Sequence, residues 1–180
     1  MVCAAVNFAA TLVMAFVLAP ATPIFTDAAE RIAYVQTNLF AWRLGWAVWI
    51  AAALSLLWFY AWWRGRIGAS YVPVALAASG FIADVTSETM LILYDATTAP
   101  FAFVLTGVVA NGLYTACGIW FTLAMRLNTV ERAWAALMWA AAITLSLATL
   151  TGLYAAAAIA TALLFALFCP WCVYLAVKLR

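Results

Sequence analysis

The chain has 180 residues, of which 71% are hydrophobic and only 8% are charged, and its formal net charge at pH 7 is +2. Soluble domains carry about 25% charged residues, so this composition excludes a soluble globular protein, a disordered chain and a nucleic-acid binder. The sequence therefore predicts an all-α, polytopic membrane protein that has the lipid bilayer as its partner and forms a single transmembrane helical domain over residues 1–180.

Six segments are long and apolar enough to be spanning helices, which need about 20 predominantly apolar residues. The first four segments are Val2–Ala19, Leu39–Trp63, Tyr71–Tyr94 and Phe101–Met125. Residues 133–177 carry no charge over 45 positions, which is the length of two spans joined by a turn near Gly152. The sequence thus predicts a six-transmembrane-helix bundle.

The segment between the first and second spans carries two further signals. Ala19-Pro-Ala21 resembles a signal-peptide cleavage site, but no basic residue precedes the apolar run, so we expect a retained first helix. Asp27 and Glu30 have the spacing of a capping box. Residues 27–38 are therefore predicted to form a short interfacial helix before the second span.

The basic residues predict the orientation of the bundle, because cytoplasmic loops carry an excess of Lys and Arg. With six spans, six of the eight basic residues fall on one side of the membrane: Arg64, Arg66, Arg126, Arg132, Lys178 and Arg180. Both termini are then cytoplasmic, and we expect the protein in a bacterial cytoplasmic membrane. Tryptophans near predicted helix ends are expected to anchor the bundle at the membrane interfaces; they are Trp42, Trp62, Trp63, Trp134 and Trp171.

The third span carries the strongest chemical signal, because Asp84 and Glu88 lie four residues apart on one helix face, with Ser87 beside them. An ionisable residue costs about 3 kcal/mol at the bilayer centre, so this face cannot meet lipid. At 1.5 Å per residue, Arg43 of the second span lies about as deep as Glu88. We therefore expect an Arg43–Glu88 ion pair, and a neutral Asp84 that is free to bind or titrate.

The fourth span carries a matching line of residues: Gly107, Asn111, Tyr114 and Gly118. Asn111 lies at the predicted depth of Asp84, roughly 16 Å from the outer boundary, so we expect a hydrogen bond between the two. Together these spans predict a pocket between helices two, three and four that opens to the outer side. Its predicted ligand-binding residues are Arg43, Trp46, Asp84, Ser87, Glu88, Asn111 and Tyr114. A polar network that only fixes helix packing is the competing interpretation.

Metal and redox chemistry are not expected. The chain has no histidine, the commonest metal ligand, so we predict no metal site and no cofactor. Cys169-Pro-Trp-Cys172 resembles the C-x-x-C motif that quinone-linked thiol oxidoreductases carry within a four-helix membrane bundle. The resemblance is limited to these four residues, and the predicted topology places the pair in the reducing cytoplasmic half. We therefore expect the four cysteines to serve as small packing residues.

Three functions fit these features. The leading hypothesis is a small membrane protein that binds, and in one version translocates, a small molecule; the small six-span substrate-binding subunits of vitamin transporters share this size and topology. The alternative is a membrane-embedded isomerase or cyclase that acts on a lipid-soluble substrate, in which Asp84 or Glu88 is the general acid and tryptophans stabilise a developing cation. The third is an accessory subunit that docks onto a membrane protein partner. An opening toward lipid would favour the enzyme, and an opening toward water would favour the binding protein.

Overall fold

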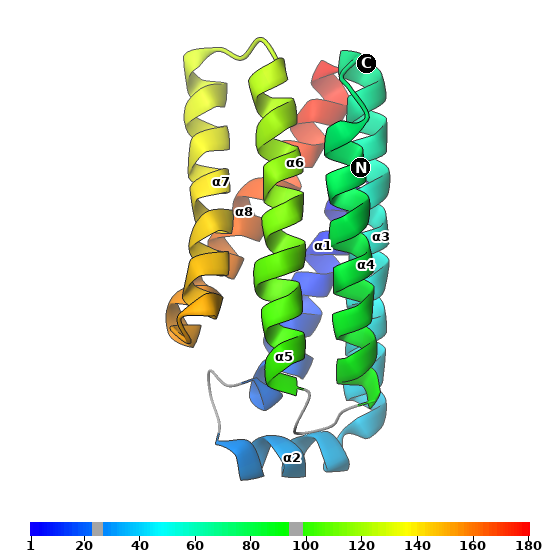
Figure 1. Cartoon of the computed structure of the whole chain (residues 1–180), viewed down its shortest axis with the longest axis vertical. Helices are drawn as coiled ribbons and strands as arrows, with labels where there is room; N and C mark the ends of the chain where they lie inside the picture. The colour runs from blue at the N-terminus through cyan, green and yellow to red at the C-terminus, as the bar shows by residue number, and fades with distance from the viewer. Residues whose placement is uncertain (23–26, 94–98) are drawn as a thin grey trace.

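The computed structural model describes residues 1–22, 27–93 and 99–180, and these residues form a helical bundle (Figure 1). Six helical segments are long and apolar enough to cross a membrane, which confirms the predicted number: Val2–Ala21, Leu39–Ile67, Val72–Leu93, Ala99–Ala124, Thr129–Leu150 and Tyr154–Lys178. The predicted end of the third span at Tyr94, and Asp95 beyond it, lie outside the described residues.

Two of the spanning segments are composite. The first consists of α1 (Val2–Val13), the π-helix η1 (Met14–Leu18) and the short 3₁₀ helix η2 (Ala19–Ala21). The fourth consists of α5 (Ala99–Val104), the π-helix η3 (Leu105–Ala110) and α6 (Asn111–Ala124). The remaining spans are the regular helices α3 (Leu39–Ile67), α4 (Val72–Leu93), α7 (Thr129–Leu150) and α8 (Tyr154–Lys178).

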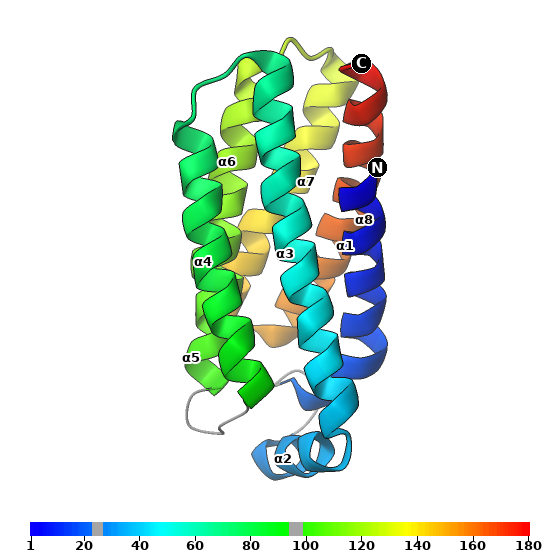
Figure 2. The same cartoon turned by 90° about the vertical axis from the view of Figure 1, so that its right-hand side faces the viewer.

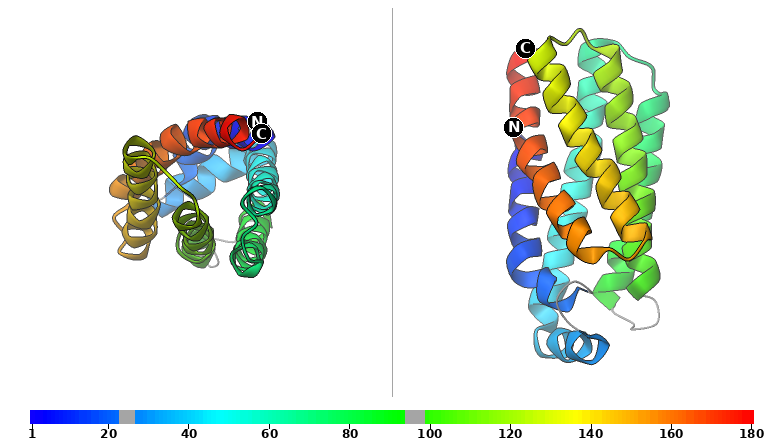
Figure 3. Two further views of the ribbon diagram at one scale, coloured as in Figure 1. Left: turned by 90° about the horizontal axis from the view of Figure 1, so that it is seen from above. Right: turned by 90° about the vertical axis from the view of Figure 1, so that its left-hand side faces the viewer.

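The spanning helices form a ring. Contacts run from α1 to α3, then to α4, α6, α7 and α8, and α8 returns to α1. Figure 2 shows α3 flanked by α1 and α4, and the view from above in Figure 3 shows the helices arranged around a central region. α3 and α6 also contact each other, but no helix occupies the middle of the ring, so side chains from every span can meet at the centre.

Local sequence signals explain several helix ends. α2 (Ala28–Thr37) begins at Asp27, whose carboxylate accepts a 2.9 Å hydrogen bond from the Glu30 amide, as the capping spacing predicts. α2 lies across one end of the bundle (Figure 1). The α7–α8 turn is at Gly152, where φ is +70° and the Leu153 amide donates to Ala148 at 2.8 Å in a Schellman arrangement.

The C-terminus and an ion pair lie at the end opposite α2, and the N-terminus lies in the same half of the bundle (Figures 1 and 2). A capping box joins Asn128 and Glu131 at the start of α7. Glu131 also pairs with Lys178 at 2.6 Å and accepts a hydrogen bond from Tyr174, both on α8. These contacts join α8 to the first turn of α7.

Tryptophans near the helix ends differ from the prediction. Trp42, Trp63 and Trp171 are fully buried in the bundle. The indole of Trp42 donates to the Leu91 carbonyl at 2.6 Å, and that of Trp63 donates to the Met125 sulfur at 3.1 Å. These three residues tie neighbouring helices together, so they are not interfacial anchors.

Candidate functional site

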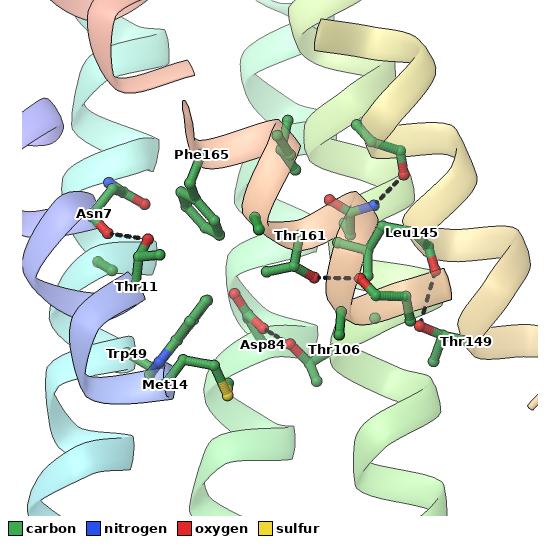
Figure 4. Close-up of a pocket in the computed structure, with 18 of the residues that line it drawn as sticks. Asn7, Thr11, Met14, Trp49, Asp84, Thr106, Leu145, Thr149, Thr161 and Phe165 are labelled. Atoms are coloured by element: carbon green, nitrogen blue, oxygen red, sulfur yellow. Dashed lines mark hydrogen bonds between the residues drawn. The ribbon is translucent and has the colours of Figure 1, made fainter. Parts of the chain in front are cut away.

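A cavity of about 710 Å³ occupies the centre of the ring. Its wall takes residues from all six spanning segments, including Asn7, Trp49, Asp84, Thr106, Leu145 and Phe165 (Figure 4). The volume lies within the range of about 300–1,000 Å³ that is typical of small-molecule sites. Most of the wall is aliphatic or aromatic, so a bound molecule would be largely surrounded by apolar groups.

Asp84 provides the acidic group on this wall, and the described lining residues include no basic side chain. Its side chain is 6% exposed and accepts a hydrogen bond from the Thr106 hydroxyl, which comes from η3 on the facing helix (Figure 4). Gly80, one turn before Asp84, permits this approach, since a Cβ there would lie 3.2 Å from the Ala110 carbonyl and from Tyr114. The Asp84–Thr106 pair is the strongest polar feature of the cavity.

Both π-helices contribute to the same cavity. Met14 and Ala15 of η1 and Thr106 and Gly107 of η3 line it. Single π turns inside α-helices occur frequently at functional sites. A Cβ on Gly107 would lie 2.8 Å from the Thr149 side chain, so glycine lets η3 pack closely against α7.

Two hydrogen-bond donors on the cavity wall lack partners. The Trp46 and Trp49 indole nitrogens are buried, and neither has a hydrogen-bond partner within the described parts of the chain. The Tyr114 hydroxyl, in contrast, interacts with the Asp84 carboxyl group. Buried polar groups of native proteins are almost always hydrogen-bonded, because an unpaired one costs about 1–3 kcal/mol. A molecule carrying an oxygen acceptor would supply the missing partner.

The predicted site residues divide into two groups. Trp46, Asp84, Asn111 and Tyr114 line the cavity, whereas Arg43, Ser87 and Glu88 do not. Ser87 is buried and donates to the Ala102 carbonyl at 2.7 Å, a contact between helices α4 and α5.

Two predicted contacts are not formed. Arg43 is exposed and its Nε lies 3.4 Å from the Ile92 carbonyl, whereas Glu88 is fully buried with neither carboxylate oxygen hydrogen-bonded to any described residue. The Arg43–Glu88 ion pair is therefore a wrong prediction. Asn111 donates to the Ala142 carbonyl and to Ser146, both at 2.8 Å, so it faces α7, and Thr106 bonds Asp84 in its place.

Sequence reasoning missed the contribution of the first and last spans. Asn7 and Thr11 of α1 and Thr161 of α8 line the cavity. Asn7 and Thr11 are four residues apart in an otherwise apolar segment, a spacing that could have indicated an inward face. The cavity is thus central to the ring and extends well beyond helices two to four.

The four cysteines are free and buried, and all belong to the large core cluster. Cys3 lies against Asn7, whose amide is 3.4 Å from the Cys3 sulfur. Over residues 1–22, 27–93 and 99–180, no group of three or more Cys, Asp or Glu side chains is arranged to hold a metal ion.

Comparison of the chain with protein-family models, curated proteins and solved structures gave no significant match.

Proposed function

We propose that this protein is an integral membrane protein that binds one small, lipid-soluble molecule in its central cavity. The observation that carries the proposal is the central cavity, which combines the Asp84–Thr106 pair with two unpartnered indole donors. The polar end of the ligand would meet these groups. Its apolar body would lie against aromatic side chains such as Phe103 and Phe165.

The same proposal places the protein in a bacterial cytoplasmic membrane with both termini in the cytoplasm. The basic residues at the ends of α3 and α8 and between α6 and α7 support this orientation, because they gather at the end opposite α2. In this orientation α2 lies at the outer interface.

The enzyme alternative needs one general acid that can reach a bound molecule. Glu88 does not line the cavity, which leaves Asp84 as the acid available for this role. An isomerase or cyclase that uses Asp84 is therefore the second candidate function, and an opening toward lipid would favour it.

The proposal is tested by untargeted mass spectrometry of the organic extract of the protein purified from its own membrane. Ala142 is buried on the cavity wall, whereas Ala140 on the same helix is exposed and does not line the cavity. Ala142→Phe should therefore remove the co-purifying molecule, and Ala140→Phe should keep it. Equal extracts from the two variants would contradict the proposal.

A further inference from the structure

The ring of helices is incomplete at one place. α1 contacts α8, but η1, which continues α1, makes no backbone contact with α8 in the described structure. α8 leans away from α1 toward the end that carries α2 (right-hand view of Figure 3). The first half of α8 and η1 therefore diverge, while all the other neighbouring spans remain in contact.

The cavity extends to both edges of this gap. Met14 and Ala15 on one side and Thr161 and Ala162 on the other all line the cavity. Ala15 and Ala162 are exposed, and their chain neighbours Phe16 and Leu163 are exposed without lining the cavity, so these two lie on the outer surface. Because the cavity wall reaches the outer surface on two elements that do not contact each other, the cavity opens laterally between them.

The surface around this opening is apolar. Phe16 is 77% exposed beside Ala15, and Ile159 is 71% exposed one turn before Ala162. Such residues face hydrocarbon in a spanning bundle, where charged side chains are costly. The opening thus meets the bilayer, and the small alanine side chains at its edges leave it unobstructed.

The polar groups that could hold a ligand lie deeper than the edges. The hydroxyls of Thr11 and Thr161 are occupied by carbonyls of their own helices, each at 2.8 Å (Figure 4). Asp84 and Tyr114 belong to α4 and α6, across the ring from the opening, whereas Trp49 of α3 packs against Phe165 of α8 with ring centroids 5.7 Å apart. A molecule entering from lipid would therefore meet an apolar passage first and hydrogen-bonding groups last.

We infer that the cavity takes its ligand directly from the bilayer, through the opening between η1 and the first half of α8. This inference rests on the proposed function and specifies the ligand class: an uncharged molecule with one hydrogen-bonding end and an apolar tail. The polar end enters first and the tail points toward the opening.

The test uses a hexadecanol probe that carries a diazirine on its alkyl chain, added to phosphatidylcholine vesicles that contain the protein. Flashes of light at increasing times after addition measure how fast adducts form on Trp49 and Phe165. The variant Ala15→Trp with Ala162→Trp narrows the opening. Ala166→Trp is the control, because Ala166 is exposed on the same helix and does not line the cavity.

In the double variant, adducts on Trp49 and Phe165 should form at least about tenfold more slowly than in the wild type. In the control, Ala166→Trp, they should form at the wild-type rate. If the tryptophan pair does not fold, Ala15→Phe with Ala162→Phe is expected to slow labelling in the same direction. Labelling at the wild-type rate in folded opening variants would overturn the lateral route and leave the binding function standing. No cavity adducts in any variant, even in detergent, would overturn both.

Discussion

Glu88 allows a quantitative test of how the bundle is packed. Its side chain is fully buried, and neither oxygen has a hydrogen-bond partner among the residues described. Burying a polar group without a partner costs about 1–3 kcal/mol in protein mutational data. The nearest basic residue by sequence depth, Arg43, is exposed instead of paired.

Glu88→Leu removes the two unpartnered oxygens and keeps a side chain of similar size. We expect it to raise the free energy of unfolding by about 1–3 kcal/mol. Arg43→Gln alters an exposed group and should change this free energy by less than about 0.5 kcal/mol. Unfolding is followed by circular dichroism during titration with sodium dodecyl sulfate in mixed micelles.

The double variant, Glu88→Leu with Arg43→Gln, shows whether the two residues are independent of each other or form a buried ion pair. Independent sites give additive changes in free energy. If Glu88→Leu alone destabilised the protein by about 3–5 kcal/mol and Arg43→Gln restored part of the loss, Glu88 would have a buried charged partner. That result would refute the packing described for α3 and α4.

Three further predictions concern the cavity, its wall and the orientation. Asp84→Asn should keep most of the affinity for the diazirine hexadecanol, whereas Asp84→Ala should lose about tenfold, the value of one hydrogen bond of about 1.4 kcal/mol; equal affinities in photolabelling titrations would exclude Asp84 from the site. Gly118→Ala should lower the free energy of unfolding by about 1–3 kcal/mol, because its Cβ would clash with the Trp139 ring; Gly112→Ala, which has open space, is the matched control. A reporter active only in the periplasm, fused after Arg180, should stay inactive, and activity there would reverse the proposed orientation.

The helices could be predicted from the sequence because their signals are local. Runs of apolar residues locate the six spans, Asp27 locates the start of α2, and Gly152 locates the turn between α7 and α8. Asp84 could also be placed inside the bundle, because a carboxyl group in a spanning helix must avoid lipid.

Side-chain partners could not be predicted, because they depend on the rotation and tilt of each helix. A rise of 1.5 Å per residue gives the depth of Asn111 but not its direction, and it faces Ser146 instead of Asp84. The π turn in η3 brings Thr106 to Asp84, and no residue pattern in the sequence marked that turn. α8 lines the cavity because of its tilt in the bundle, and the amino-acid composition of a helix does not determine its tilt.

Native mass spectrometry of the protein released from its own membrane tests the central claim most directly, because it measures how many molecules each chain carries. The proposed function predicts one bound lipid-soluble molecule per wild-type chain, and a bare chain for folded Ala142→Phe, which places a larger side chain on the cavity wall. A bare wild-type chain, or the same bound mass on wild type and Ala142→Phe, would contradict the claim that this cavity is a binding site.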